Sequence, residues 1–175
     1  MKKVLFAIPL ALALTGCGSD IDLVKGGVME FNQTTTLGKA LDNWESCESR
    51  EWEEFETDNG IKVVQFTCQH KISQYMSKAK SLLSEEEQAK ANHLDIASNI
   101  QTFQFTINQG DTFQIDNVQV KTTWQDGTSF EDSQKPVEQL ETAYANNLNF
   151  DPAELNEMGA AQISYVFSMI KMRAK

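Results

Sequence analysis

Residues 51–70 constrain the fold of this chain most strongly, because they have the pattern of a β-hairpin. Asn59-Gly60 separates two runs rich in aromatic and β-branched residues, and this dipeptide favours a two-residue turn whose central residues both have positive φ. With that turn, Phe55 pairs with Val64. One face of the hairpin then carries Phe55, Val64, Phe66 and Cys68, and the opposite face carries Trp52, Glu54, Glu56, Ile61, Val63 and Gln65.

A helix is predicted directly before the hairpin, over residues 37–47. Threonine at position 36 is a suitable N-cap, and apolar residues recur at helical spacing up to Cys47. The predicted register places Glu51 opposite Cys68, so the end of the helix meets the open end of the hairpin. Cys47 and Cys68 are therefore expected to lie close together.

Residues 1–16 have the features of an export signal. Lys2 and Lys3 precede an apolar run of eleven residues over positions 4–14. A helix that crosses a bilayer needs about 20 apolar residues, so this run is too short to span one. Its length and flanks are those of a secretory signal.

The four residues Leu14-Thr15-Gly16-Cys17 resemble the lipobox of bacterial lipoproteins. The resemblance implies cleavage before Cys17, diacylglycerol on its sulfur and a third acyl chain, such as palmitate, on the new amino group. Two or more acyl chains hold a protein firmly to a membrane. In enteric-type lipoproteins an aspartate after the cysteine retains the protein at the inner membrane. Gly18 stands there, which favours the periplasmic side of the outer membrane over the inner membrane or the cell surface. An ordinary signal followed by an accidental cysteine is the alternative.

Removal of residues 1–16 leaves 159 of the 175 residues, enough for one domain with its own core. We expect the lipidated cysteine and a short polar tether over residues 17–27, and a single domain over 28–175. In an oxidising compartment, the remaining pair of cysteines favours a Cys47–Cys68 disulfide. Free thiols are one alternative. A metal site from Cys47, Cys68 and His70 is the other, although no fourth ligand is evident.

The charge of the mature protein argues against nucleic acid as a partner. The chain has 15 Lys and Arg and 25 Asp and Glu, and the signal removes two lysines, which leaves 13 against 25 and a net charge of −12. Phosphate backbones and anionic headgroups repel such a chain. Its hydrophobic content of 41% is too high for a disordered protein.

The segment after the hairpin is predicted to begin with two helices. The first carries one apolar stripe, and a Ser84-x-x-Glu87 capping box opens the second. The first stripe comprises Ile72, Tyr75, Met76, Ala79 and Leu83, and the second comprises Ala89, His93, Ile96, Ala97 and Ile100.

Residues 102–131 return to a period of two, with turns near Gln109-Gly110 and at Asp126-Gly127. This pattern predicts an antiparallel meander of three or four strands with one buried face. A helix is expected from Pro136, and another over residues 153–172 after Asp151-Pro152. A final strand over residues 163–172 is the alternative. The predicted fold class is α+β, with an antiparallel sheet of about five or six strands, helices mainly on one face and a disulfide brace.

The order of lipobox, tether, Thr-capped helix, Trp and hairpin is similar to the small outer-membrane lipoproteins of the SmpA/OmlA type. These are α+β modules that accompany the β-barrel assembly machinery. The resemblance covers about residues 28–70 and rests on arrangement, and the longer second half and the internal disulfide depart from it. It therefore assigns no functional residues.

The chain lacks recognisable catalytic motifs and has only two histidines. His93 is expected on the apolar stripe of a helix, and His70 in an exposed position at a strand end. No metal and no cofactor are expected. Trp52, Ile61 and Val63 are the candidate partner-binding residues, because the predicted hairpin turns them away from the helix-covered face. A second layer that covers them is the alternative.

These observations predict a non-enzymatic, lipid-anchored envelope protein. It is expected to attach to the membrane through Cys17 and to bind another envelope protein or support envelope assembly. A periplasmic inhibitor or ligand-binding lipoprotein is the alternative, and an enzyme of unfamiliar type ranks third.

Overall fold

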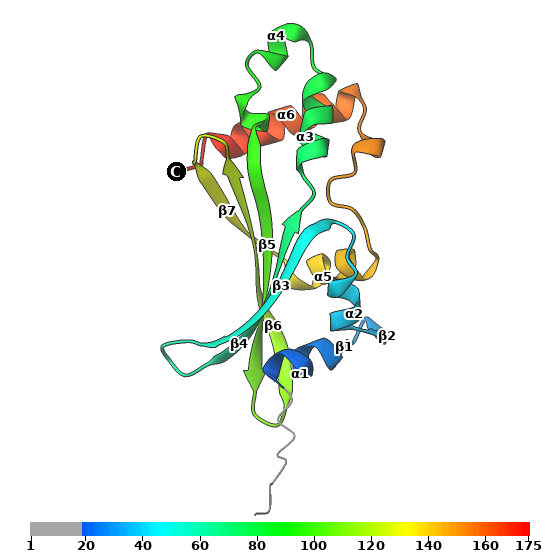
Figure 1. Ribbon diagram of the computed structural model, residues 1–175, viewed down its shortest axis with the longest axis vertical. Coiled ribbons are helices and arrows are strands. Elements are labelled where there is room, and N and C mark those ends of the chain that lie inside the picture. The colour runs from blue at the N-terminus through cyan, green and yellow to red at the C-terminus, as the bar shows by residue number, and fades with distance from the viewer. Residues whose placement is uncertain (1–18) are drawn as a thin grey trace, which may run out of the picture.

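A five-stranded antiparallel sheet forms the centre of the protein in a computed structural model that describes residues 19–175 (Figure 1). The signal, the lipobox and Cys17 lie outside the described residues. The strands follow each other in chain order across the sheet. They are β3 (Cys47–Glu56), β4 (Lys62–His70), β5 (Ile96–Asn108), β6 (Thr112–Trp124) and β7 (Ser129–Gln134). The predicted α+β class and meander are confirmed.

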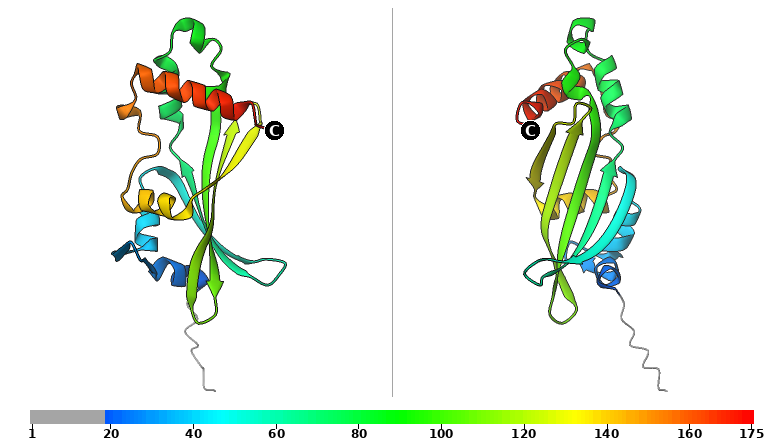
Figure 2. Two further views of the ribbon diagram at one scale, coloured as in Figure 1. Left: turned by 180° about the vertical axis from the view of Figure 1, so that it is seen from behind. Right: turned by 60° about the vertical axis from the view of Figure 1, so that its left-hand side comes forward.

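The helices cover one face of the sheet, here called the inner face, and leave the other uncovered (Figure 2, right). They are α1 (Asp20–Gly26), α2 (Leu37–Asp42), α3 (Ser73–Ser81), α5 (Pro136–Tyr144) and α6 (Glu157–Lys171). The shorter elements are α4 (Glu85–Gln88), the 3₁₀ turns Asn92–Leu94 and Pro152–Glu154, and a small sheet of β1 (Val28–Met29) and β2 (Asn32–Thr36).

Two hydrophobic clusters lie between the helices and the inner face. The first packs α1, α2 and α5 against the sheet around Trp44, Phe66 and Phe103, all fully buried. The second packs α3 and α6 around Trp124 and Phe167 at the other end of the sheet. Burial of such large apolar side chains is the main source of stability for a domain of this size.

The register of the β3–β4 hairpin differs from the prediction by one residue. Phe55 pairs with Val63 instead of Val64, because the loop Asp58-Asn59-Gly60 has three residues and not two. Gly60 has φ of 76°, as a three-residue hairpin loop with a left-handed glycine requires. A shift of one residue moves every side chain of β3 to the opposite face relative to β4. Trp52 therefore lies on the inner face opposite Phe66, and Phe55 is exposed.

The predicted disulfide between Cys47 and Cys68 is confirmed, with Cα atoms 5.3 Å apart. The helix before it is shorter than expected: α2 begins after its N-cap Thr36 and ends at Asp42, so Cys47 starts β3. Because both sulfurs are in the bridge, the alternative metal site from Cys47, Cys68 and His70 does not form.

The short polar tether predicted over residues 17–27 is helical over residues 20–26, which form α1. Ser19 and Asp22 make a reciprocal capping box, and Val24 is fully buried. Gly27 allows close packing, since a Cβ there would lie 2.3 Å from the Phe113 ring. The folded domain therefore begins two residues after Cys17.

The second predicted helix after the hairpin is only partly correct. The Ser84–Glu87 capping box is present, but α4 ends at Gln88, and residues 96–100 belong to β5. Ile96 and Ile100 are β-branched and pair with β6, which overrides the helical spacing.

The helices at the end of the chain are close to prediction. The α5 helix begins at Pro136 as expected, and residues 163–171 are helical, so the alternative of a final strand is wrong. The α6 helix starts at Glu157 instead of 153, because Asn156 caps it and Pro152 begins only a short 3₁₀ turn.

Candidate functional site

A band of buried polar side chains crosses the inner face between the two hydrophobic clusters. Because β4, β5 and β6 are aligned in register, inward-facing positions bring His70, Asn99, Gln101 and Thr122 together. Each is at most 6% exposed. Buried polar groups are costly unless they are paired, so this band needs a hydrogen-bond network.

His70 is at the centre of that network and is buried, not exposed as predicted. The backbone N–H of Asn149 donates to Ser46 Oγ at 3.1 Å, and Ser46 Oγ lies 2.9 Å from His70 Nδ1. His70 Nε2 lies 2.9 Å from Gln101 Oε1, whose amide donates to Gln139. With Gln101 Oε1 as the acceptor, His70 carries its proton on Nε2 and accepts from the Ser46 hydroxyl.

The network keeps His70 neutral. Burial lowers the pKa of His70 below its ordinary value of 6.5, and the contacts of the ring with the Gln101 side chain and the Ser46 backbone oppose this effect only in part. The Trp44 ring, 5.2 Å away between centroids and edge-on, contributes to the burial.

A cavity of about 250 Å³ lies beside this network. Aromatic and aliphatic side chains, among them Phe130, Phe150 and Phe167, form its apolar walls. Its polar lining comprises His70, Asn99, Thr122, Asp132, Gln134, Gln139 and Asn149. The cavity therefore offers neutral hydrogen-bonding groups, one carboxylate and no cationic side chain.

Asn99 leaves part of its hydrogen-bonding capacity unused. Its Nδ2 donates to Thr122 Oγ1 at 2.9 Å, while its Oδ1 has no partner within the described part of the chain. An unsatisfied buried acceptor costs about 1–3 kcal/mol. Asn99 Oδ1 and Tyr144 Oη are the two buried side-chain atoms without a protein partner in residues 19–175, and Asn99 belongs to the lining of the cavity, where a bound group can pair with its Oδ1.

Ser46 and His70 have the side chains of a nucleophile and a general base, but both are buried and make their hydrogen bonds within the network. Ser46 is 3% exposed and already accepts from Asn149. The second imidazole nitrogen faces the amide oxygen of Gln101, where a hydrolase triad has a carboxylate that stabilises the imidazolium. The arrangement suits binding better than acyl transfer.

The three predicted partner-binding residues do not form one patch. Trp52 is half-buried on the inner face, where its Nε1 donates to Asp42 at 2.8 Å and its ring centroid lies 4.9 Å from that of Phe66, with the two rings tilted by 50°. Val63 faces the other side and is buried, and only Ile61, beside the hairpin turn, is well exposed. The one-residue register shift is the cause.

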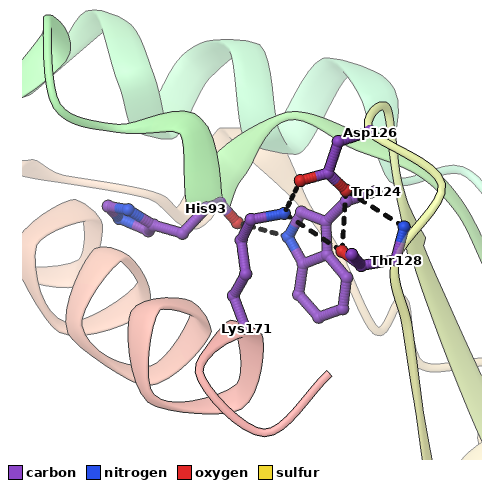
Figure 3. Close-up of polar contacts among 5 residues, drawn as sticks. All are labelled: His93, Trp124, Asp126, Thr128 and Lys171. Atoms are coloured by element: carbon purple, nitrogen blue, oxygen red, sulfur yellow. Dashed lines mark hydrogen bonds and ion pairs between the residues drawn. The ribbon is translucent and has the colours of Figure 1, made fainter. Parts of the chain in front are cut away.

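His93 lies in the 3₁₀ turn Asn92–Leu94 and not on a long helix. Figure 3 shows its ring pointing away from the cluster formed by Trp124, Asp126, Thr128 and Lys171. Its Nε2 lies 2.7 Å from Ser164 Oγ, and its carbonyl accepts from the Trp124 indole at 2.8 Å. Partial burial lowers the pKa of His93. These contacts dock the turn on α6.

Within residues 19–175, no group of three or more His, Cys, Asp or Glu side chains is placed to hold a metal ion. The polar band was missed in the sequence because residues 96–100 were assigned to a helix. The alternation Asn99-Gln101-Phe103-Phe105 is the signal that places these residues on one buried strand face.

The comparisons with known proteins identify the class through the N-terminus. Residues 1–17 match the model of the prokaryotic membrane lipoprotein lipid attachment site. The protein is thus a bacterial lipoprotein that is anchored to a membrane through Cys17. No curated protein and no solved structure matches the chain, and the resemblance to SmpA/OmlA-type lipoproteins stays a prediction. None of the helices over residues 19–175 is long and apolar enough to cross a bilayer.

Proposed function

We propose that this lipoprotein is a non-enzymatic binding module that holds an uncharged polar group of another envelope component in its inner-face cavity. The unpaired Oδ1 of buried Asn99, in a lining of neutral hydrogen-bonding groups, is the observation that carries the proposal. The buried Ser46–His70 pair, which makes its hydrogen bonds within the network, supports a non-enzymatic role.

The lining indicates the chemical class of the ligand. A neutral His70 and the lack of a lining cation disfavour an anion, and Asp132 repels one. Aromatic walls with amide and hydroxyl groups suit a group with both an apolar face and polar edges. The volume of about 250 Å³ is below the roughly 300–1,000 Å³ of sites for drug-sized ligands. A single sugar ring or a short amide-bearing group fits these limits.

Ligand binding is expected to raise the thermal unfolding midpoint of the full-length lipidated protein in detergent. The probes are uncharged hexoses and N-acetylated amino sugars, with the corresponding free amino sugar and sugar acid as charged counterparts. A ligand at 100 times its Kd stabilises the folded state by about 2.7 kcal/mol. We expect a response to the neutral probes and none to the sugar acid.

The matched control is the double variant Asn99→Leu/Thr122→Val, which replaces both partners of one buried hydrogen bond by apolar groups of similar size. Such a pair of changes is nearly neutral or stabilising, so this variant should unfold at the midpoint of the unmodified protein or above it. It should lose the response to neutral probes. An equal response in both proteins would exclude this cavity. No response to any probe would favour the scaffold or inhibitor hypothesis.

We further propose the outer membrane, facing the periplasm, as the location, because Gly18 follows Cys17 in place of an aspartate. In density-gradient fractions of an enteric-type host, the protein is expected with the outer membrane. Gly18→Asp should move it to the inner membrane. Co-migration of both forms with the inner membrane would contradict the proposal.

A further inference from the structure

The outer side of α6 carries an apolar stripe that no other described element covers. Met158, Tyr165 and Met172 are 80%, 66% and 72% exposed, and Met169 is 44% exposed. Their spacing, with Gln162, alternates between four and three residues, which places them along one side of the helix. In the view from behind, α6 lies in front of α3 and the strands with nothing over it (Figure 2, left). Exposed apolar patches of this kind mark interaction sites.

The stripe belongs to a helix that is held firmly on the domain. Lys171 Nζ lies 2.6 Å from Asp126 Oδ2, 3.2 Å from Thr128 Oγ1 and 4.9 Å from the centroid of Trp124 (Figure 3). These contacts lower the pKa of Asp126 to about 2, chiefly through the bond to Lys171. Ala160 and Phe167 are buried on the inner side of α6. The exposed stripe is therefore presented in one orientation.

The position of α6 argues against the anchoring membrane as the occupant. The α1 helix, whose N-cap Ser19 lies two residues after Cys17, is at one end of the long axis, and α6 lies at the opposite end (Figure 1). The lipid anchor therefore holds the membrane at the far end from the stripe.

The stripe can instead pair with the same stripe of a second copy of the chain, with Tyr165 at the centre of the contact. Met158 and Met172 lie seven residues, close to two helical turns, to either side of Tyr165. In an antiparallel pair of α6 helices centred on Tyr165, each Met158 faces the Met172 of the other copy. A self-complementary patch is what a two-fold symmetric dimer requires.

We propose that α6 is the interface of a homodimer in which two copies pair antiparallel about Tyr165. The α6 helix runs across the long axis (Figures 1 and 2). A two-fold axis along that long axis therefore makes two neighbouring α6 helices antiparallel and leaves both N-termini at the same end. Both anchors can then enter one membrane, and anchoring raises the effective concentration of one copy for the other.

Disulfide trapping in the native envelope tests this pairing. Tyr165→Cys in the full-length lipidated protein is expected to shift most of the chain to twice the monomer mass on a non-reducing gel after mild oxidation. Glu141→Cys, an exposed site on α5, is the matched control and should stay monomeric. Equal cross-linking of both variants, or an adduct of Tyr165→Cys with a different protein, would overturn the proposal.

The ends of the stripe test the antiparallel arrangement. Two copies of Met158 would lie roughly 21 Å apart along the paired helices, at 1.5 Å per residue over fourteen residues. Met158→Cys alone should therefore stay monomeric, whereas its co-expression with Met172→Cys should give a disulfide between the two chains. A self-cross-link of Met158→Cys alone would contradict antiparallel pairing. Tyr165→Asp, which sets two carboxylates against each other at the symmetry axis, should abolish trapping of the Met158→Cys and Met172→Cys pair.

Discussion

Removal of the Cys47–Cys68 disulfide is expected to lower the free energy of unfolding by about 3 kcal/mol in the chain-entropy model, given the sequence separation of 21 residues. The cross-link restricts the unfolded chain, so its loss makes the unfolded state more favourable. Both cysteines are buried, and the bridge joins the first residue of β3 to β4 two residues before His70. We therefore also expect the polar network of Ser46 and His70 to loosen.

Urea unfolding of Cys47→Ala/Cys68→Ala, compared with the unmodified protein with and without reductant, measures this effect. The reduced unmodified protein should approach the double variant. Unchanged unfolding midpoints on reduction would mean that the bridge contributes little to stability. Proton exchange at the backbone of Asn149, whose N–H is bonded to Ser46, reports separately on the polar network.

Replacement of His70 by leucine is expected to destabilise the protein by about 3 kcal/mol near neutral pH, because it leaves Ser46 Oγ and Gln101 Oε1 without their partner. Each buried unsatisfied group costs about 1–3 kcal/mol. The imidazole is 2% exposed, so solvent does not replace the lost contacts.

The same residue gives stability a defined dependence on pH. The pKa of folded His70 lies below 6.5, so on acidification the unfolded chain binds the proton first. The stability contributed by neutral His70 is present above about pH 6.5 and is lost as the pH falls from there toward the folded pKa. His93 acts in the same direction, since its pKa is also lowered.

This account is tested by measuring the free energy of unfolding of the unmodified protein, His70→Leu and His93→Gln at about pH 5 and about pH 7.5. These two values bracket the ordinary imidazole pKa. The unmodified protein should be less stable at the lower pH, and His70→Leu should lose most of that difference. His93→Gln is the matched control, because it removes only the half-buried histidine. An undiminished difference in the His70 variant would contradict the assignment of the pH dependence to His70.

Local signals with a direct physical cause were predicted correctly from the sequence. Ser84–Glu87 makes its capping box, Thr36 caps α2, Pro136 begins α5 and Asp126-Gly127 turns the last hairpin, with Gly127 at a φ of 85°. Each of these depends on residues that are neighbours in the chain. The same is true of the lipid attachment site at residues 1–17.

The predictions that were wrong concern segments whose structure depends on the length of a loop or on contacts with distant residues. One extra loop residue at Asp58 changed the face of Trp52 and separated it from Val63, so the predicted patch did not form. Pairing with β6 made residues 96–100 a strand. Contact with the sheet folded residues 20–26 onto the domain, where Val24 is buried.

The sequence by itself therefore determined the lipoprotein class, the α+β composition, the helix caps and the pairing of Cys47 with Cys68, since each follows from local chemistry or from the compartment. Only the tertiary structure decided which side chains share the interior. Strand register placed His70, Asn99 and Thr122 around one cavity, and the packing of α6 on the sheet left Tyr165 and its neighbours outside. Alternation of side chains along a strand is local, but the partner that each one meets depends on a register set across the whole sheet.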